Sequence, residues 1–422
     1  MWRRSGCRIV SFPQRPSWPV RKRVPGPGLR DNYAIGPVAA LHGATIRYNS
    51  PFATEESMTS LTATDLRAAL ESFVEPLSGV SLGAAGTVGA VSLDGGGLSV
   101  EVTLGFPVGG YEAEFEGALL EHLRRQGFEG PVRLALRARI APFVGNRGAE
   151  ALPGISNVIA VASGKGGVGK STVAANFALA LARQGARVGV LDADIYGPSQ
   201  PRMMGLSGQR PTTRDGKSFE PLSNYGVKVM SIGFLVDDEQ PMVWRGPMVT
   251  QALVQLLGET RWGDLDYLVV DMPPGTGDIQ LTMAQRVPLS GAVVVTTPQE
   301  IALLDARKGL MMFRKVEVPV LGIVENMSVH VCPACGHESH VFGAGGGQGM
   351  AERYGVPLLG ELPLDLRIRE QADAGSPTVV GDPESAAARA YMSVARKAAA
   401  QLAAAAVHGA GVFPKISVED NE

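Results

Sequence analysis

Between residues 157 and 407, short apolar runs alternate with longer stretches of helical periodicity. Continuous apolar runs are typical of parallel strands buried on both faces, and they occur at 157–163, 186–191, 266–270 and 320–325. An Ala- and Leu-rich stretch follows the first run and predicts a helix over 171–184 that ends at Gly185. The alternation predicts an α/β domain, residues 157–407, with a mostly parallel sheet and helices on both faces.

Residues 58–142 carry a different pattern, in which apolar and polar positions alternate between two helical stretches. The expected elements are a helix capped by Thr64, a hairpin that turns at Asp94-Gly95-Gly96-Gly97, a second helix and a final strand: 65–73, 86–93, 98–105, 111–126 and 132–140. We therefore expect a small α+β domain over 58–142, followed by a linker over 143–156.

The first 57 residues are rich in Pro, Arg and Gly and have neither strand nor helix periodicity. They hold nine Lys or Arg and three Asp or Glu, while the whole chain has a net charge of −2. We expect a disordered leader or an over-extended reading frame, with Met58 as a plausible start. An organelle signal is the alternative, although no amphipathic helix is evident.

An Ala-rich stretch over 386–407 predicts a terminal helix packed on the surface. Arg389, Arg396 and Lys397 interrupt it, so it does not have the pattern of a membrane span. The tail over 408–422 ends in acidic residues, which repel anionic lipid. With the near-balanced charge, these features predict neither a membrane nor a nucleic-acid partner.

A glycine-rich run joins the first predicted strand of the α/β domain to its helix: Gly164-Lys165-Gly166-Gly167-Val168-Gly169-Lys170-Ser171-Thr172. It fits the phosphate-loop spacing, in which glycines let backbone N–H groups surround a phosphate at a helix N-terminus. Lys170 is expected to reach the β- and γ-phosphates, and the Ser171 hydroxyl to ligate Mg²⁺. The sequence therefore predicts a nucleoside triphosphate site.

Carboxylates follow two other predicted strands. Asp192 and Asp194 come after 186–191, and Asp271 comes after 266–270 and opens the run Asp271-Met272-Pro273-Pro274-Gly275-Thr276-Gly277-Asp278. Ligands of open α/β sheets bind beyond the carboxyl ends of the strands, where such carboxylates can hold Mg²⁺ directly or through water. Gly275 is a candidate hinge that senses the γ-phosphate. The alternative for each Asp is a structural turn.

Three cysteines are present: Cys7, Cys332 and Cys335. Few cysteines and no secretory leader favour a reducing compartment, and we expect a cytoplasmic protein. The Cys332-Pro333-Ala334-Cys335 pair leaves three alternatives open. It can be half of a zinc site completed by His337 and His340, a redox pair, or half of the thiolate set of a [4Fe–4S] cluster, which a two-fold dimer would complete. Both histidines are expected to be loop residues rather than ligands.

The glycine-rich run, with Lys165 after its first glycine, resembles the deviant phosphate loop of the class that contains MinD, ParA and the nitrogenase iron protein. The resemblance implies that Lys165 reaches the partner's nucleotide across a dimer, and that Asp194 lies near the attacking water. It also implies that Asn326, in Val324-Glu325-Asn326-Met327, hydrogen-bonds adenine. Lys165, Lys170 and Asp194 are then the catalytic candidates.

Three segments resemble more narrowly the Mrp-type iron–sulfur cluster carrier ATPases: 271–278, 243–247, and the stretch from Asn326 to Cys335. The resemblance implies ATP and Mg²⁺, with Ser171 and Asp271 at the metal, and a [4Fe–4S] cluster bridged by Cys332 and Cys335 of a homodimer. An iron–sulfur scaffold and recipient apoproteins are the implied partners. Residues 58–142 resemble the cluster-assembly domain often fused before these ATPases, but hold no cysteine here.

Two other functions remain open on sequence alone. A ParA- or MinD-like positioning ATPase acting on DNA or membrane would have the same nucleotide site without needing the cysteine pair. An electron-transfer ATPase like the nitrogenase iron protein would also bridge a cluster, but its cysteines lie far apart in sequence. The close spacing of Cys332 and Cys335 favours a labile cluster that is carried and released.

Overall fold

The computed structural model describes residues 61–145, 150–236 and 246–410. The predictions for residues 1–57, for 243–245 and for the tail beyond residue 410 lie outside the described residues. Where the chain is described, the two expected patterns form two separate sheets, one of eight strands and one of three, and a short two-stranded ribbon.

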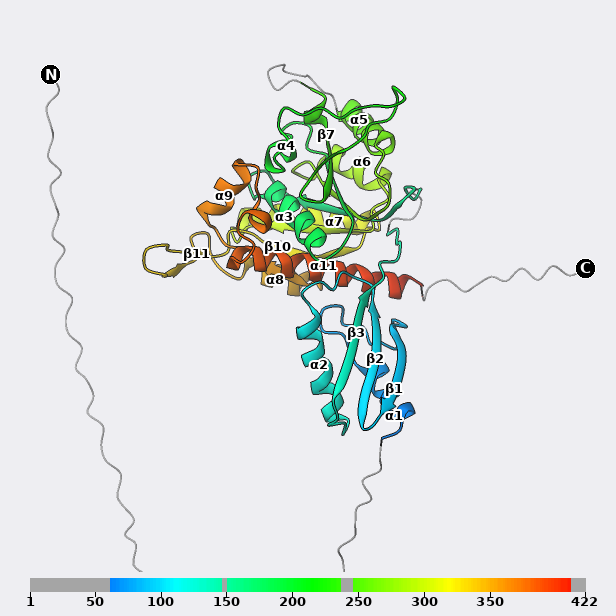
Figure 1. Ribbon diagram of the computed structural model, residues 1–422. Coiled ribbons are helices and arrows are strands. Elements are labelled where there is room, and N and C mark those ends of the chain that lie inside the picture. Colours follow the sequence, from blue (N-terminus) through cyan, green and yellow to red (C-terminus); the bar gives the residue numbers. More distant parts are fainter. Residues whose placement is uncertain (1–60, 146–149, 237–245, 411–422) are drawn as a thin grey trace, which may run out of the picture. The chain divides into compact units, whose positions relative to one another are not determined.

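The eight-stranded sheet has the order β13-β10-β9-β4-β8-β5-β7-β6 (Figure 1). All neighbours in it run parallel except β6, which is antiparallel to β7. Its strands are β4 (Ile155–Ser163), β5 (Val188–Asp192), β6 (Leu222–Asn224), β7 (Val227–Ser231), β8 (Leu265–Asp271), β9 (Gly291–Thr296), β10 (Val320–Glu325) and β13 (Leu358–Glu361). The predicted α/β class with a mostly parallel sheet is confirmed.

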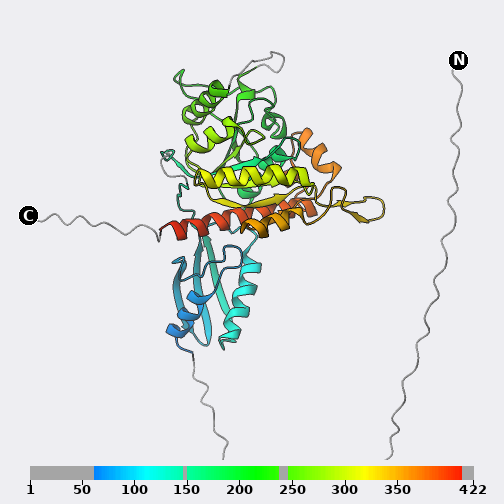
Figure 2. The ribbon, with the colours of Figure 1, turned by 180° about the vertical axis from the view of Figure 1, so that it is seen from behind.

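Helices cover both faces of this sheet. α3 (Lys170–Arg183) and α11 (Ala386–Ala410) lie on the face nearer the viewer in Figure 1, and α7 (Glu300–Lys315) and α8 (Gly346–Tyr354) on the face nearer the viewer in Figure 2. The remaining helical segments of this part are α4 (Gln200–Met203), η1 (Ile232–Phe234), α5 (Gly246–Glu259), α6 (Asp278–Arg286), α9 (Leu366–Asp373) and α10 (Thr378–Gly381). Because both faces are covered, the central strands are apolar along their whole length.

The centre of the sheet positions the site. β4 lies between β8 and β9, and the next strand along the chain, β5, pairs with the far side of β8. The connection from β4 to β5 therefore passes to one side of β4 and the connection from β8 to β9 to the other, and the loops at the carboxyl ends of these strands diverge. Such a switch point is where open α/β sheets bind ligands.

α11 is buried more deeply than the surface-packed helix that its sequence predicts. Ala395, Ala398, Ala399 and Ala400 are fully buried, and the helix packs against α3, α10 and β13. Small side chains let the backbones of α3 and α11 approach closely, so the Ala-rich composition of α11 reflects tight packing rather than exposure. Over the described ranges, no helix combines the length and apolar character needed to cross a membrane.

The three-stranded sheet has the order β1-β2-β3 and packs against two helices. Its elements are α1 (Ala63–Ser72), β1 (Val88–Asp94), β2 (Gly97–Leu104), α2 (Glu112–Arg125) and β3 (Val132–Ala138). The helix cap differs from the prediction: Thr62, not Thr64, caps α1, because Thr62 and Asp65 form a reciprocal capping box. Thr64 lies inside the first turn.

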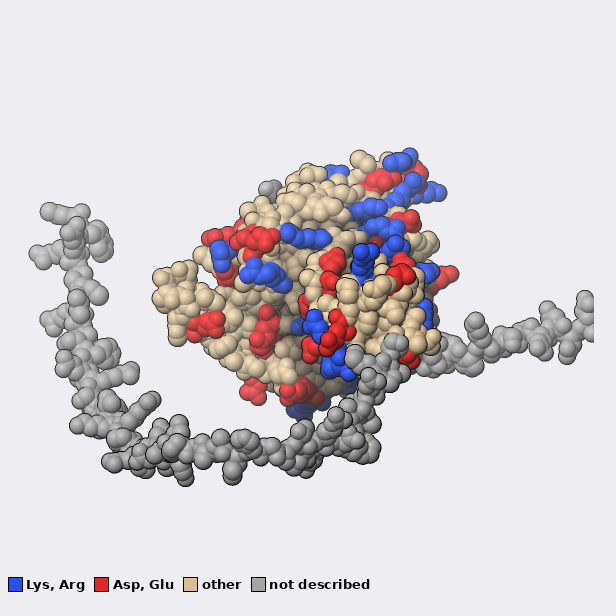
Figure 3. Space-filling model, turned by 60° about the horizontal axis from the view of Figure 1, so that its bottom comes forward, with Lys and Arg blue, Asp and Glu red and all other residues tan. Residues whose placement is uncertain are grey.

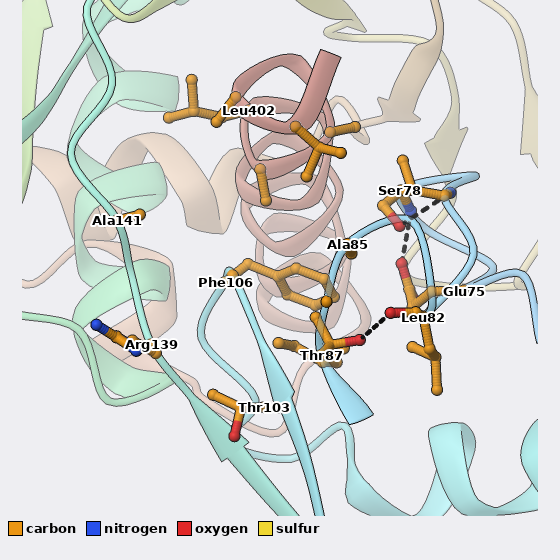
Figure 4. Close-up of a pocket in the computed structure, with 18 of the residues that line it drawn as sticks. Glu75, Ser78, Leu82, Ala85, Thr87, Thr103, Phe106, Arg139, Ala141 and Leu402 are labelled. Atoms are coloured by element: carbon orange, nitrogen blue, oxygen red, sulfur yellow. Dashed lines mark hydrogen bonds between the residues drawn. The ribbon is translucent and has the colours of Figure 1, made fainter. Parts of the chain in front are cut away.

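A cavity of about 580 Å³ is lined by the loop after α1, the end of β2 and the last turns of α11 (Figure 4). Phe106, Ala85 and Leu402 give it mainly apolar walls. Its acid, Glu75, is buried, and its carboxylate accepts hydrogen bonds from the Ser78 N–H at 2.6 Å and the Tyr111 hydroxyl at 2.6 Å. Glu75 is therefore engaged in holding its own loop.

Candidate functional site

The glycine-rich run forms a tight turn between β4 and α3. Gly167 and Gly169 have φ angles of 81° and 79°, which side chains other than glycine rarely adopt. Gly164 has another constraint, because a Cβ atom there would lie 2.1 Å from the carbonyl carbon of Asp305 in α7. The glycines of the motif thus serve two purposes, backbone conformation and close packing on α7.

Lys170 lies at the centre of the site. Its ammonium donates to Asp271 Oδ1 at 2.5 Å and to Ser171 Oγ at 3.1 Å, and it lies 3.6 Å from Asp194 Oδ2. The Lys170 side chain is 5 % exposed and that of Asp271 is fully buried. The structure thus brings together Lys170, Ser171, Asp194 and Asp271, as the sequence predicts for a phosphate and magnesium site.

Asp192 and Asp194 have different surroundings despite their close spacing. Asp192 is fully buried and accepts hydrogen bonds from Gln200 N, Ser231 Oγ and Asp194 N at 3.1–3.2 Å. Burial, followed by the charge of Asp271, raises the pKa of Asp192 to about 7. Burial also raises the pKa of Asp194, while Lys170 opposes the shift. Asp192 therefore organises the turn, and Asp194 faces Lys170.

Gln200 in α4 belongs to the site but was missed from the sequence. Its Nε2 donates to Asp271 Oδ2 at 2.9 Å and to the Ser171 carbonyl at 3.0 Å. Its buried Oε1 has no partner among the described residues. No motif or periodicity marks Gln200, because only the packing of α4 over the strand ends brings it to Asp271.

Lys165 and the candidate hinge Gly275 both contact Ser163, the last residue of β4. Lys165 is partly exposed, and its carbonyl accepts a hydrogen bond from Ser163 Oγ at 2.9 Å. Gly275 has a φ of 99°, and its N–H donates to the Ser163 carbonyl at 3.0 Å. The candidate hinge is thus in direct contact with the start of the phosphate loop, and it needs glycine for its backbone conformation.

Asn326 follows β10 and also contacts the phosphate loop. Its Nδ2 donates to the Val168 carbonyl at 2.8 Å, and its own N–H donates to the Thr296 carbonyl at 2.7 Å. The side chain is buried against the loop. Asn326 is therefore next to the nucleotide site, and adenine recognition by it stays a prediction.

The cysteine pair lies at the tip of a two-stranded ribbon rather than in an irregular loop. β11 (His330–Val331) pairs with β12 (Glu338–Ser339), and a tight turn closes between Cys332 and His337 with the Cys332 N–H donating to the His337 carbonyl at 2.9 Å. Both thiols are free, and Cys335 is exposed. We call residues 328–340 the cysteine hairpin.

The tip of the cysteine hairpin has no charged side chain, since residues 326–337 include no Lys, Arg, Asp or Glu. The cysteine hairpin projects from the left edge in Figure 1. The lobe at the left edge in Figure 3 is mostly tan, the colour of residues other than Lys, Arg, Asp and Glu. The backbone N–H groups of Ala334 and Cys335 lower the pKa of the Cys332 thiol. A thiolate at Cys332 is thereby favoured at the exposed tip.

Neither nearby histidine completes a metal site with the cysteines in one chain. His340 Nδ1 is 2.8 Å from the Ser328 carbonyl, a contact that orients the ring toward the hairpin base. Within the described parts of the chain, no three His, Cys, Asp or Glu side chains gather closely enough to hold a metal. This favours the prediction that His337 and His340 are loop residues.

A phosphate loop between a central parallel strand and a helix, with a lysine held by strand-end carboxylates, defines a P-loop NTPase. Comparison with known families narrows the class. The model of the family described as NUBPL iron-transfer P-loop NTPase (ParA) matches residues 154–399, and the chain belongs to this family. The predicted resemblance to cluster carrier ATPases is confirmed.

Individual relatives agree with the family match. An iron–sulfur cluster carrier protein of Pseudomonas fragi is 61 % identical over 264 residues, which cover 62 % of this chain and 92 % of that protein. A protein of the same name from Haemophilus influenzae is 49 % identical over 333 residues, 79 % of this chain and 90 % of that protein. A nucleotide-binding protein of Archaeoglobus fulgidus, solved with ADP, is 41 % identical with a TM-score of 0.49, covering 55 % of this chain and 90 % of that one.

Proposed function

We propose that this P-loop NTPase hydrolyses ATP and carries an iron–sulfur cluster, which two copies of the chain hold between their cysteine hairpins. The observation that carries the proposal is the placement of Cys332 and Cys335. They are a partly exposed and an exposed thiol at the uncharged tip of the cysteine hairpin, in a chain whose buried polar groups serve a nucleotide. The family membership and the names of the relatives agree with this function.

At the nucleotide site, Lys170 and the amides of the glycine-rich run hold the phosphates. Nucleotide entry would draw the Lys170 ammonium from Asp271 toward the β- and γ-phosphates, which frees the carboxylate for Mg²⁺. Ser171 Oγ and Asp271 supply oxygen ligands that suit Mg²⁺, and the unpartnered Gln200 Oε1 is a further acceptor beside them for a metal-bound water. The metal, when bound, neutralises charge on the transferred phosphoryl group.

Asp194, 3.6 Å from Lys170, is the group that we assign to the attacking water. Lys165 is assigned to the partner's nucleotide across the dimer, and Asn326 to the adenine base. These assignments follow from the family resemblance, and the position of each residue around one loop is compatible with them.

The thiol count supports a shared cluster. A [4Fe–4S] cluster takes four thiolates, whereas one cysteine hairpin supplies two. A two-fold axis brings the same surface of each chain together, so two hairpins would supply four. The uncharged tip allows this approach without repulsion between like charges. The cluster would pass from an iron–sulfur scaffold protein to recipient apoproteins in a reducing compartment such as the cytoplasm.

Anaerobic reconstitution with iron and sulfide tests the proposal. We expect a dimer with half a [4Fe–4S] cluster per chain, read from absorbance, oligomer size and metal content. Cys332→Ser and Cys335→Ser should lose the cluster and keep ATP affinity within about twofold, while Cys7→Ser, the matched control, keeps both. One zinc per monomer, or normal cluster transfer by both hairpin variants, would overturn the proposal.

A further inference from the structure

The segment between Asn326 and Gly347 leaves the sheet and returns to it at a single point. Asn326 begins it directly after β10, and Gly347, in the first turn of α8, ends it against the last residue of β10, Glu325. The cysteine hairpin is the middle of this segment. Two adjacent residues, Glu325 and Asn326, therefore define the base of the whole excursion.

Glu325 anchors the return. Its side chain is fully buried, and its Oε2 accepts a hydrogen bond from the Gly347 N–H at the N-terminus of α8, where a carboxylate is favoured. A Cβ atom on Gly347 would lie 2.9 Å from this oxygen, so the close contact requires glycine. The preceding Gly346 is held as tightly, since its Cβ would lie 2.6 Å from Leu303 of α7.

Asn326 holds the start of this segment to the phosphate loop. Its amide holds the Val168 carbonyl, and a Cβ on Gly169 would lie 2.3 Å from Nδ2. Phosphate binding to this loop cannot shift Val168 or Gly169 without moving the Asn326 side chain. The main chain at these two residues is bonded to both neighbouring segments, since the Glu325 carbonyl accepts the Leu362 N–H at 2.8 Å and the Asn326 N–H donates to the Thr296 carbonyl of β9.

One arm of the hairpin is bonded to Leu362, which follows β13, and the other arm is bonded to the first. The Ser328 N–H donates to the Leu362 carbonyl at 3.0 Å, and the Ser328 carbonyl contacts His340 Nδ1. Met327, between Asn326 and Ser328, has a φ of 59°, a conformation that is strained for a side chain of this kind. The base of the hairpin is therefore short, strained at Met327 and held by hydrogen bonds. A displacement of Asn326 should therefore move the hairpin rather than be absorbed at its base.

The Glu325 carboxylate has one engaged oxygen and one spare. Oε1 is buried and has no partner among the described residues, although a buried acceptor normally has one. Burial raises the pKa of this carboxyl, the Gly347 N–H lowers it, and Glu361 of β13 and His340 of the hairpin act on it in opposite directions.

We propose that Glu325 is a positioning residue that couples the state of the nucleotide site to the exposure of Cys332 and Cys335, by holding Gly347 to the strand whose next residue, Asn326, holds the phosphate loop. The inference deepens the proposed function and rests on it, since it names the contact through which ATP acts on cluster release.

Thiol accessibility in the cluster-free full chain tests this coupling. In a Cys7→Ser background, the rate at which iodoacetamide modifies Cys332 and Cys335 is measured without nucleotide, with ADP and with a non-hydrolysable ATP analogue. The parent protein should change its rate at least about threefold between nucleotide states. Glu325→Leu, which is similar in size and removes both acceptor oxygens, should bind the analogue within twofold of the parent and lose most of that change.

Glu361→Leu is the matched control, because Glu361 neighbours Glu325 in the sheet while the Gly347 N–H is bonded to Glu325. It should keep the full nucleotide response. Gly347→Ala, which presses a methyl group on Oε2, should lose it as Glu325→Leu does, and covers the case in which the leucine variant folds poorly. A parent-like response in both variants, or no response in the parent, overturns the coupling. Because no cluster is present, failure of the cluster-carrier proposal shows itself separately in reconstitution.

Discussion

The phosphate-loop region and the cysteine hairpin differ in how complete they are within one chain. In the first, Lys170 is bonded to Asp271 and Ser171, and Gln200 closes over the same carboxylate. In the second, Val331 of the hairpin and Val341 directly after it are 46 % and 58 % exposed, and the two thiols have no metal-ligand set around them within the described residues. One site is internally paired, and the other is open.

The difference follows from the groups each site must hold. Buried charges are costly unless they are paired, so a site that collects phosphate charge has to supply its own cation and carboxylates before the ligand arrives. Thiols cost little when exposed, and under the proposed function they complete their ligand set with a second chain. Lys170, Ser171, Asp194 and Asp271 are thus brought together within one chain, whereas the proposed cluster site needs two.

The largest effect is expected for Lys170→Ala. Removing the ammonium leaves Asp271 and Asp194 without their cation and takes away the main phosphate contact, so ATP affinity should fall at least about 100-fold, roughly 3 kcal/mol. Iodoacetamide modification of the nucleotide-free hairpin should stay unchanged. Calorimetric titration measures the affinity. Lys308→Ala, on the exposed side of α7, is the control, and binding within fivefold of the parent would contradict the assignment.

Two alanine substitutions in the phosphate loop separate the packing of Gly164 on α7 from the general cost of replacing a glycine. Gly164→Ala places a Cβ 2.1 Å from the backbone of Asp305, whereas a Cβ on Gly166 meets nothing within 4 Å. The first should lower the free energy of unfolding by about 2–3 kcal/mol, and the second by less than about 1 kcal/mol. Urea denaturation of the nucleotide-free proteins compares them. Equal losses would show that α7 does not pack on Gly164 as described.

Much of this arrangement is predictable from sequence because it is local. The four strands predicted at 157–163, 186–191, 266–270 and 320–325 appear as apolar runs, two of them are followed by the carboxylates of the site, and the glycine spacing identifies the loop. Gly164 is an instructive exception: its motif position was predicted, but the reason for glycine there, contact with Asp305 over 100 residues later, needs the fold.

The residues that sequence reasoning missed act across elements. Gln200, Ser231 and the Glu325–Gly347 contact have ordinary sequence surroundings, and their roles arise where strand ends and helix starts converge. A weak signal existed for Glu325, since a charged residue ends an otherwise apolar strand. The Thr62 cap was misplaced by two residues because Thr62 and Thr64 are chemically equivalent, and only the reciprocal bond to Asp65 distinguishes them.

The pH dependence of stability tests whether burial raises the pKa of Asp192 in the nucleotide site. Its pKa is raised to about 7, so the carboxyl ionises near pH 4 when unfolded and near pH 7 when folded. Its contribution to stability therefore decreases as pH rises between about 4 and 7 and is constant above that window. Asp192→Asn should remove most of this pH dependence across the window, measured by urea denaturation without nucleotide or Mg²⁺.

The slope is the readout for Asp192, because the asparagine amide also disturbs the bonds to Gln200 and Ser231 and shifts stability at every pH. Asp278→Asn, an exposed acid at the start of α6, serves as the control and should leave the slope as it is. An unchanged slope in the Asp192 variant would mean that the carboxyl is ionised in the folded protein across this range.

The smallest expected effect lies within the open site. The N–H groups of Ala334 and Cys335 lower the pKa of Cys332, so this thiol has a larger thiolate fraction at neutral pH than an ordinary cysteine. In brief iodoacetamide treatment at pH 7, Cys332 should be modified about two- to fivefold faster than Cys335, although Cys335 is the more exposed.

Peptide mass spectrometry of the cluster-free protein measures both rates, with Cys332→Ser and Cys335→Ser as controls. The excess should shrink as pH rises toward 9, because the lowered pKa of Cys332 then no longer gives it a larger thiolate fraction. Faster modification of Cys335 at pH 7 would mean that exposure outweighs the backbone hydrogen bonds, and that the hairpin does not prepare either thiol before its partner arrives.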